Sequence, residues 1–420
     1  MVATMARVVM KFGGTSVANV EYLRRVATRL IERARGGDEV VCVVSAMGKV
    51  TDDLLALAHE ISTCPSEREL DMLLSTGEQV SIALLTMAIQ AQGHDAISFT
   101  GSQVGIVTDA VYSKAKIVRI DAACVLDALT QNKIVIVAGF QGRTIDGQIT
   151  TLGRGGSDTT AVALAAGIKA DVCEINSDVK GVYTADPRMV PKARKIDHIS
   201  YEEMLEMAAS GAGVLSMRSV EFARNYGVVI HSRSSFAPAT EIGTIVREGK
   251  PGMQGIEGTE GMEDAVVSAI THDVSEAKIT IRGVPDKVGT AARVFGTLAD
   301  YNVNVDMIIQ NISDAGMTDI SFTAPEADLQ RVGSALEVCL KEIGARTWLI
   351  DKKVAKVSIV GAGMKTHPGV TAKMFETLAD VGVNIDLIST SPIRLSCIIA
   401  ADQVELAVSA LHTAFGLDRE

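Results

Sequence analysis

The 420-residue chain has few aromatic residues, a single tryptophan, and fewer basic than acidic side chains. Aromatic residues make up 4 % of it, and 40 Lys and Arg stand against 51 Asp and Glu, so the formal charge is −11. An acidic surface with few aromatic rings is unsuited to nucleic acid and to anionic membranes. We therefore expect no nucleic-acid or membrane partner, and any polyanionic ligand must be held by local groups.

The chain also lacks long apolar runs and metal-binding patterns. No stretch looks long enough for a secretory signal or a membrane-spanning helix. The six cysteines are scattered without a C-x-x-C pair, and the seven histidines are dispersed. Cys42 lies in the apolar run Val40–Val44, which is typical of a buried, reduced thiol. The sequence predicts a cytoplasmic protein without a metal site or a catalytic histidine.

Glycine is abundant, with 37 residues, and short β-branched runs alternate with amphipathic ones as far as about residue 235. We predict strands at Val8–Phe12, Val40–Ser45, Ile134–Ala138, Val172–Ile175 and Val228–His231. We predict helices at Val20–Ala34, Leu70–Gln92, Ile120–Gln131, Thr159–Ala166, Ser200–Ala209 and Ser216–Tyr226. This alternation predicts an α/β fold with a mainly parallel sheet sandwiched by helices.

The last third of the chain contains an internal repeat. Phe295–Ile308 aligns without gaps with Phe375–Ile388, and nine of fourteen positions are identical. Each copy has a β run, a Gly-containing loop, a helix and a second β run. Such units are either packing modules or sites for an anionic ligand at the strand–loop–helix junction, and the repeat alone does not decide between them.

The composition also suggests domain limits. Residues 249–264 are rich in glycine, contain a proline and have no periodicity, so we predict a linker there. We predict an N-terminal domain at 1–248 and two smaller domains at 265–345 and 346–420.

Three polar, glycine-containing segments carry the chemistry. The first is Lys11–Ser16 (K-F-G-G-T-S), where adjacent glycines and a lysine follow a strand and can form an anion site. It matches neither the dinucleotide-binding nor the P-loop pattern, and alone it could be a simple strand-end turn. The second is Thr151–Thr160, in which Arg154 lies among glycines and Ser157 or Asp158 is expected to cap a helix. The third is Ser177–Arg188, a long polar loop after a predicted strand.

Further clusters stand at other strand and helix ends: Ser45–Asp53, Ser75–Glu78 and Phe140–Gly142. Asp52 and Asp53 could simply stabilise the start of a helix. Because the carboxyl ends of parallel strands meet at one edge of a sheet, we expect the glycine-containing loops to converge on one crevice.

Together these segments, in this order, resemble aspartate kinases of the amino-acid kinase family. The resemblance rests on K-F-G-G-T-S, V-S-A-M-G, S-T-G-E, S-F-T-G-S-Q, A-G-F-Q-G, T-T-L-G-R-G-G-S-D-T-T-A and S-D-V-K-G-V-Y-T-A-D-P-R. The C-terminal repeat is similar to tandem ACT domains of βαββαβ type. The resemblance implies transfer of the ATP γ-phosphoryl group to the side-chain carboxylate of L-aspartate, with Mg²⁺ carried on the nucleotide, and feedback inhibition by lysine or threonine.

The resemblance also implies roles for individual residues. Those implied in catalysis are Lys11, Gly14 and Asp158. Those implied in ATP binding are Lys11, Phe12, Gly13, Gly14, Ser45, Ser177, Asp178, Tyr183, Asp186, Pro187 and Arg188. Those implied in aspartate binding are Thr51, Glu78, Arg154, Gly155, Gly156 and Ser157, with Arg154 on the α-carboxylate and Glu78 on the ammonium group. A carboxylate nucleophile is already ionised at neutral pH, so no general base is expected.

For the ACT domains, the resemblance implies effector contacts at Asp286, Gly289, Gln310, Asn311, Thr390 and Ser391. Asp306 and Asp386, which occupy equivalent places in the two repeats, are either effector contacts or structural residues. Assembly of copies through the ACT sheets is implied as well, and a start at Met253 or Met262 would give a separate regulatory subunit.

The chain departs from the family pattern at four positions. Gly213 stands where a lysine is usual near the nucleotide, Asn176 replaces an aromatic residue, Lys180 an acidic residue or proline, and Val288 a proline. These changes motivate an alternative interpretation, an amino-acid-binding regulatory protein with a weakened kinase domain. Another carboxylate or a carbamate as acceptor is a third possibility.

Overall fold

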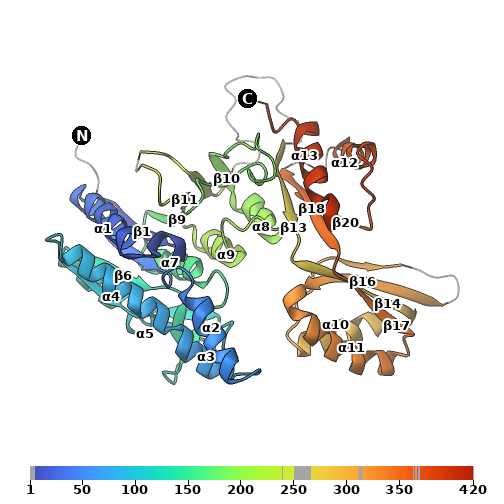
Figure 1. Cartoon of the computed structure of the whole chain (residues 1–420), viewed down its shortest axis with the longest axis horizontal. Coiled ribbons are helices and arrows are strands. Elements are labelled where there is room, and N and C mark those ends of the chain that lie inside the picture. Colours follow the sequence, from blue (N-terminus) through green and yellow to red (C-terminus); the bar gives the residue numbers. More distant parts are fainter. Residues whose placement is uncertain are drawn as a thin grey trace. The chain divides into compact units, whose positions relative to one another are not determined.

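The computed structural model describes residues 5–238, 240–249, 266–311, 316–362, 364, 367 and 369–419. They divide into two compact units (Figure 1). The first unit contains 5–183, 195–208 and 213–249, and the second contains 184–194, 209–212 and 266–419. The predicted linker lies outside the described residues except for Gly249, and the domain limits stay predictions.

The first unit is built on an eight-stranded sheet. Its strands, in sheet order, are β10 (His198–Ser200), β12 (Thr244–Arg247), β11 (Ile230–Ser234), β9 (Val172–Ser177), β1 (Arg7–Phe12), β2 (Glu39–Val44), β6 (Ile134–Ala138) and β3 (Ala96–Phe99). Neighbouring strands are parallel except β11 and β12. The prediction of a mainly parallel sheet is therefore confirmed.

Helices cover both faces of this sheet. The helices of this part of the chain are α1 (Val20–Arg35), α2 (Val50–Ile61), α3 (Glu67–Leu74), α4 (Thr76–Gln90), α5 (Gly101–Val104), α6 (Ala123–Thr130), α7 (Gly156–Gly167), α8 (Tyr201–Ala209) and α9 (Met217–Tyr226), with the 3-10 helix η1 (Gly14–Val17). Of these, α1, α4, α5, α6 and α7 pack against the strands of the eight-stranded sheet. A smaller sheet has the order β5 (Ile117–Ile120), β4 (Ile106–Thr108), β7 (Gln141–Arg143) and β8 (Ile149–Thr151).

The alternation of side chains along β1 decides which residues reach the site. Val8, Met10 and Phe12 are buried in the core formed with α1 and α4. Because successive side chains of a strand point to opposite faces, Lys11 lies on the other face, which α7 covers. Lys11 is thus placed beside the residues that begin α7.

Three local predictions need correction. Helix α7 begins at Gly156 with Gly155 as its N-cap residue, so neither Ser157 nor Asp158 caps it and both lie in its first turn. The helix predicted at Leu70–Gln92 is two helices that meet at Ser75. Ile120 ends strand β5, and the helix predicted from this residue starts at Ala123.

The statement that no apolar run could span a membrane also needs correction. The run Glu67–Gln90 is long and apolar enough by composition, but 50 % of its most apolar window is buried inside the structure. Burial of this kind is found in core helices of globular domains, where an apolar face packs against a sheet.

The second unit has two four-stranded antiparallel sheets. The first has the order β15 (Ile308–Gln310), β16 (Met317–Pro325), β14 (Glu276–Pro285) and β17 (Thr347–Asp351). The second has the order β19 (Leu387–Ser391), β20 (Arg394–Ala400), β18 (Val354–Ala362) and β13 (Val266–Asp273). The helices are α10 (Thr290–Asp300) and α11 (Leu329–Ile343) in the first repeat and α12 (Gly369–Asp380) and α13 (Val404–Ala414) in the second, with short 3-10 turns η2 (Glu326–Asp328) and η4 (Ala401–Gln403).

The two repeats therefore have the ACT-like arrangement that the sequence repeat suggested, with one exchange of strands. β13 precedes the first repeat in the chain but pairs with β18 of the second repeat. β17 follows residue 345 yet pairs with β14 of the first repeat. A division of the chain at residue 345 would therefore separate β17 from its own sheet.

The second unit also includes a segment from the middle of the chain, 184–194. Ala185 and Val190 belong to the hydrophobic core around β13 and α13. The Thr184 hydroxyl lies 2.9 Å from Nε2 of the buried His412, and the Ile270 N–H donates to the Thr184 carbonyl at 2.8 Å. These contacts tie the segment to the C-terminal repeat.

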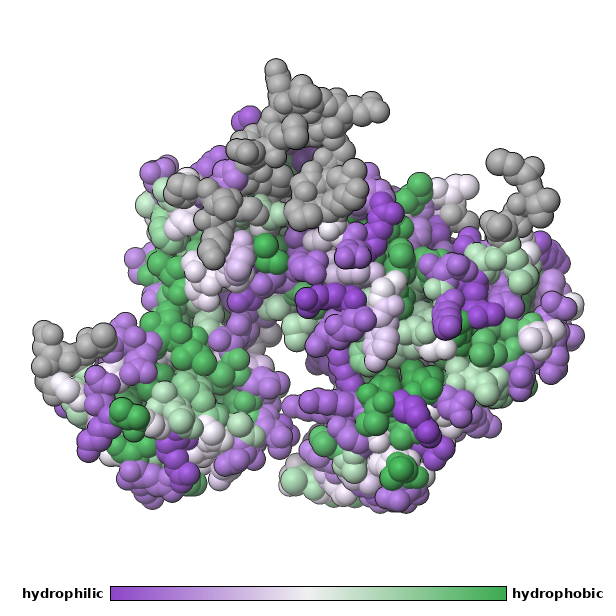
Figure 2. Space-filling view, turned by 180° about the vertical axis from the view of Figure 1, so that it is seen from behind, coloured by the Kyte–Doolittle hydropathy of each residue, from purple (hydrophilic) through white to green (hydrophobic). Residues whose placement is uncertain are grey.

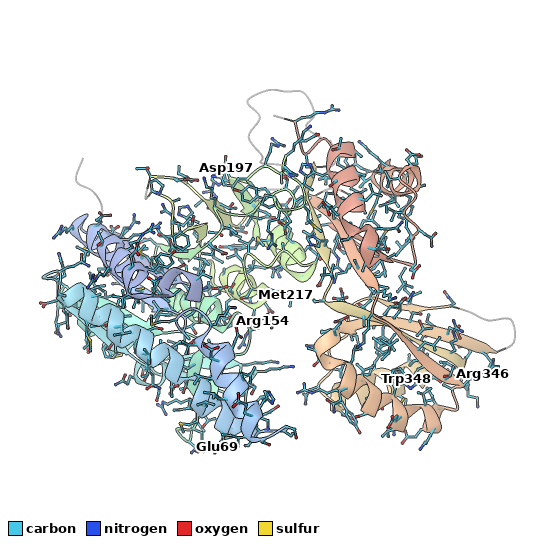
Figure 3. All side chains as sticks on the ribbon, viewed as in Figure 1. Glu69, Arg154, Asp197, Met217, Arg346 and Trp348 are labelled. Carbon is cyan, nitrogen blue, oxygen red and sulfur yellow. The ribbon has the colours of Figure 1, made fainter. Side chains whose placement is uncertain are left out.

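On the face drawn in Figure 2, hydrophilic residues are interspersed with hydrophobic ones over both units. Side chains cover the described chain densely in Figure 3, which labels Arg154 in the first unit and Trp348 in the second.

Candidate active site

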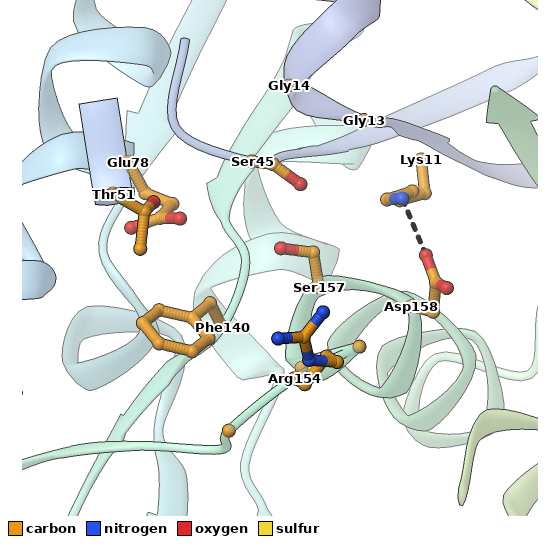
Figure 4. A pocket seen from close by; sticks show the side chains of 13 residues that line it. Lys11, Gly13, Gly14, Ser45, Thr51, Glu78, Phe140, Arg154, Ser157 and Asp158 are labelled. Atoms are coloured by element: carbon orange, nitrogen blue, oxygen red, sulfur yellow. Dashed lines mark ion pairs between the residues drawn. The ribbon is translucent and has the colours of Figure 1, made fainter. Parts of the chain in front are cut away.

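Loops at the ends of β1, β2 and β6 and at the starts of α2, α4 and α7 enclose a cavity in the first unit (Figure 4). Its volume is about 250 Å³. The residues that line it are Lys11, Gly13, Gly14, Ser45, Thr51, Glu78, Phe140, Gly153, Arg154, Gly155, Gly156, Ser157 and Asp158. The predicted convergence on one crevice is therefore seen for the segments Lys11–Ser16, Ser45–Asp53, Ser75–Glu78, Phe140–Gly142 and Thr151–Thr160, but not for Ser177–Arg188, none of whose residues lines the cavity.

An ion pair lies at one side of the cavity. Lys11 Nζ is 2.6 Å from Asp158 Oδ1, and each side chain is 12 % exposed (Figure 4). β1 supplies the lysine and the first turn of α7 supplies the aspartate. Asp158 thus fixes the ammonium group of Lys11 at the edge of the cavity, where it can neutralise an incoming anion.

Glu78 is a buried carboxyl group in the cavity wall. Its side chain comes from the first turn of α4, and Oε1 accepts the N–H of Ala46 at 3.0 Å. Oε2 has no hydrogen-bond partner among the described residues. Burial raises the pKa of Glu78 to about 7, although the Ala46 N–H acts in the opposite direction. A cationic group placed beside Oε2 would favour the ionised form.

The loop after β1 needs glycine for steric reasons. A Cβ atom at Gly14 would lie 2.8 Å from the Ala46 carbonyl oxygen, a distance that real Cβ atoms do not show. The Gly13 N–H donates to the Asn176 carbonyl at 3.3 Å, so it is engaged between β1 and β9. Of the two amides predicted to face a ligand, that of Gly14 is the better candidate.

Arg154 lies in a loop between two glycines with positive φ, Gly153 (+76°) and Gly155 (+72°). Its side chain is exposed and forms no ion pair within the described chain. Ser157 and Gly156 follow directly in α7. A free guanidinium group at the rim of a cavity is suited to a carboxylate.

Several residues implied in ATP binding do not line this cavity. The Phe12 side chain is fully buried in the core. Ser177, Asp178 and Tyr183 lie elsewhere in the first unit, and Asp186, Pro187 and Arg188 belong to the second. Arg188 Nη2 forms an ion pair with Asp186 at 2.6 Å, and this hydrogen bonding lowers the Asp186 pKa.

Phe140 and Gly153 line the cavity but were not among the residues with an implied role. Phe140 has φ = +68°, a conformation that is rare for a bulky side chain and is often found at functional sites. The Phe140 N–H donates to Thr160 in α7 at 3.1 Å. The A-G-F-Q-G motif contains this residue, but nothing in the motif indicates its positive φ.

The four departures from the family pattern have different surroundings. A Cβ atom at Gly213 would have no neighbour within 4 Å, so a side chain fits there. Asn176 is fully buried, and its Oδ1 has no partner among the described residues. Lys180 forms an ion pair with Glu241 at 3.0 Å, and Val288 is fully exposed.

A second cavity, of about 380 Å³, lies in the second repeat of the second unit. It is lined by Met364, Val370, Thr371, Thr390, Ser391, Pro392, Arg394 and Leu395. Thr390 and Ser391 are two of the implied effector contacts. The other four, Asp286, Gly289, Gln310 and Asn311, are exposed and line neither of these two cavities.

No group of three or more His, Cys, Asp and Glu suited to a metal ion occurs among the described residues. The expectation that Mg²⁺ arrives on the nucleotide therefore stays a prediction. All six cysteines are free, and Cys42, Cys173, Cys339 and Cys397 are buried.

Comparison with known proteins places the chain in a family. Residues 6–232 match the model of the amino acid kinase family, and residues 279–340 and 357–415 match two ACT domain models. An aspartokinase of Mycolicibacterium smegmatis is 53 % identical over 416 residues, which is 98 % of this chain and 97 % of that protein. The chain belongs to the aspartokinases of the amino acid kinase family.

Other aspartokinases agree in length and in fold. The aspartate kinase of Pseudomonas putida is 49 % identical over 99 % of this chain and 98 % of its own. The crystal structure of E. coli aspartokinase III in complex with aspartate and ADP matches with a TM-score of 0.81 and 27 % identity, over 97 % of this chain and 99 % of that one. As an aspartokinase, the protein is an ATP-dependent phosphotransferase with a carboxyl acceptor.

Proposed function

We propose that this aspartokinase transfers the ATP γ-phosphoryl group to the side-chain carboxylate of L-aspartate, which gives 4-phospho-L-aspartate for lysine, threonine and methionine biosynthesis. One observation carries the proposal: an anchored lysine, a buried carboxyl group and an unpaired arginine face one cavity of about 250 Å³. These three groups match the charges of an amino acid with an anionic side chain.

The substrate is held at its two ends. The Arg154 guanidinium binds the α-carboxylate, and Glu78 Oε2 accepts the α-ammonium group, which ionises Glu78 despite its raised pKa. Thr51, Gly155, Gly156 and Ser157 complete the wall. The side-chain carboxylate is directed toward Lys11 and Gly14.

Phosphoryl transfer between two anions requires positioning and charge neutralisation rather than a base. Lys11, held by Asp158 at 2.6 Å, neutralises the transferring group, and the Gly14 amide binds one of its oxygens. A cavity of about 250 Å³ is small beside typical ligand sites of about 300–1,000 Å³. It therefore takes the reacting ends, with Ser45 in its wall, while Ser177, Asp178 and Tyr183 of the same unit hold the rest of the nucleotide. Mg²⁺ bound to the ATP phosphates adds positive charge at this place.

We further infer feedback inhibition by lysine or threonine bound to the ACT repeats, assembly of copies through these repeats, and a cytoplasmic location. The cavity beside Thr390 and Ser391 supports an effector site in the second repeat. An effector can inhibit only if it binds two states of the enzyme with different affinities.

The test is trapping of the acyl phosphate. The protein is incubated with MgATP, L-aspartate and hydroxylamine, and aspartyl hydroxamate is measured with and without lysine and threonine. Product above that of a Lys11→Ala variant is expected. No product at any ATP concentration would contradict the proposed reaction and favour an amino-acid-binding role without turnover.

A further inference from the structure

The loop 152–156 that presents Arg154 has one internal backbone hydrogen bond, from the Gly156 N–H to the Gly153 carbonyl at 2.9 Å. Gly153 and Gly155, on either side of Arg154, have positive φ values that glycine adopts without cost but also leaves easily. The direction of the Arg154 side chain therefore also depends on groups that hold the loop from outside.

Arg218, in the first turn of α9, is one such group. Its Nη1 donates to the Leu152 carbonyl at 2.9 Å, and its Nη2 donates to the Ala115 carbonyl at 2.8 Å. Leu152 and Ala115 are 3 % and 0 % exposed, so these carbonyls have little access to water. Figure 3 labels Arg154 and Met217, the residue that precedes Arg218. The guanidinium fork thus joins the loop, the segment beside it and α9.

The partners of Arg218 are unusual for a charged side chain. It forms no ion pair with the described residues, and burial lowers its pKa, while Asp109 and Glu221 at longer range act in the opposite direction. A half-buried arginine that bridges two carbonyls fixes their relative position, because its planar group can donate to both at once.

The rest of the loop is held at its ends. Thr151, just before it, donates its N–H and hydroxyl to the buried Asp71 carboxylate at 2.8 and 2.7 Å. At the other end, a Cβ atom on Gly155 would lie 2.5 Å from Ser216 Cβ, so the start of α9 packs directly against the glycine. On the N-terminal side of Arg154, Arg218 holds the Leu152 carbonyl from α9.

We propose that Arg218 is a positioning residue that holds the 152–156 loop so that Arg154 meets the α-carboxylate of the substrate. This inference rests on the proposed function, which assigns that carboxylate to Arg154. Without Arg218 the loop becomes more mobile. Recognition of the α-carboxylate should then weaken, whereas phosphoryl transfer to the side-chain carboxylate should be affected less.

The test compares two acceptors, L-aspartate and β-alanine, which has the ammonium group and the reacting carboxylate but no α-carboxylate. Their kcat/KM values are measured by hydroxamate formation, or β-alanine is titrated as a competitive inhibitor where turnover is too slow. Arg218→Met is expected to lower the preference for aspartate about tenfold, which corresponds to about 1.4 kcal/mol. Arg218→Lys, which can reach one carbonyl, should retain part of the preference and serves if Arg218→Met does not fold.

Two further variants separate the outcomes. Arg224→Met changes an exposed arginine of the same helix, paired with Glu202, and should leave the preference unchanged. Arg154→Ala should abolish it. If Arg154→Ala lowers the preference but both Arg218 variants lose activity toward the two acceptors equally, Arg218 has only a structural role and the inference is overturned. If Arg154→Ala leaves the preference intact, the assignment of the α-carboxylate is wrong, and the inference falls with it.

Discussion

Lys356 and Asp306 form an ion pair that joins the two ACT repeats. Lys356 Nζ, on β18 of the second repeat, lies 2.7 Å from Asp306 Oδ2 of the first repeat and 2.9 Å from Glu276 Oε1. The equivalent lysine of the first repeat, Lys278, pairs with Asp386 of the second repeat. The aspartate of each repeat thus binds the lysine of the other. These ion pairs favour a structural role for Asp306 and Asp386 over a role as effector contacts.

The two pairs differ in burial, and this difference gives a prediction. The Lys356 side chain is fully buried, whereas those of Lys278 and Asp386 are 20 % and 36 % exposed. Lys356→Met leaves Glu276 without its cation and Asp306 with only the Arg394 guanidinium at 3.8 Å, and it should lower the free energy of unfolding by about 3 kcal/mol. Lys278→Met, the matched control, should cost about 1 kcal/mol or less. Trp348, the single tryptophan, lies in β17 of the same unit, so its fluorescence reports this unfolding. Equal losses would contradict the role of burial.

The contribution of Lys356 should not vary near neutral pH. Burial lowers its pKa, but Glu276 and Asp306 outweigh burial and the pKa is raised. A lysine with a raised pKa in the folded state contributes stability that is fully present below its unfolded value and is lost only as pH rises above it. The Lys356→Met loss should therefore be the same at pH values of about 6 and about 8, well below the lysine value of about 10.4.

Replacing Glu78 should have two opposite effects: a gain in stability at high pH and a loss of affinity for aspartate. Burial raises the pKa of Glu78 to about 7, so its contribution to stability is present below the unfolded value of about 4.3 and is lost as pH rises through about 7. Glu78→Gln should therefore be more stable than the wild type at about pH 8, by on the order of 3 kcal/mol. Urea unfolding at two pH values measures this.

The same variant should bind aspartate worse. In the wild type, KM for aspartate should fall as pH rises through about 7, because ionised Glu78 accepts the ammonium group. Glu78→Gln should raise KM at least about tenfold, equivalent to about 1.4 kcal/mol, and flatten this dependence. A wild-type pH profile shared by the variant would rule out Glu78 as the titrating group.

Lys11→Ala should act on kcat. Removing one preorganised group that neutralises the transferring phosphoryl group costs about 10²–10³ in kcat. Lys133→Ala, just before β6 at the opposite edge of the sheet, is the control and should have no effect. The rate at saturating MgATP and aspartate gives kcat, and rates at varied substrate concentrations give KM. An increase in KM without a loss of kcat would assign Lys11 to binding alone.

Gly213→Lys should lower KM for ATP severalfold, because the resemblance places a lysine near the nucleotide and a side chain at this position meets open space. Gly213→Gln, of similar length without the charge, separates electrostatics from contact. An equal fall in KM with both variants would assign the effect to contact rather than to charge, and no change with either would show that the glycine at this position does not weaken nucleotide binding.

Much of the candidate site could be predicted from the sequence. Strand ends followed by glycine and a charged residue imply a shared crevice in a parallel sheet, and the loops of Lys11, Ser45, Glu78 and Arg154 do meet there. The alternation of β1 also follows from the sequence, because an apolar core on one face leaves Lys11 on the other.

Tertiary structure decided what depends on residues far apart in the chain. The sequence did not show that Gly155 rather than Ser157 caps α7, that Phe140 takes a positive φ, or that β13 pairs with the second repeat. Burial that raises the Glu78 pKa and the bonds from Arg218 to the Arg154 loop are likewise products of packing. The shortage of aromatic and basic residues, by contrast, is visible in the sequence alone. It argues against extended polyanion-binding surfaces, because such surfaces need many charges or rings, whereas a cavity needs only a few groups that the fold brings together.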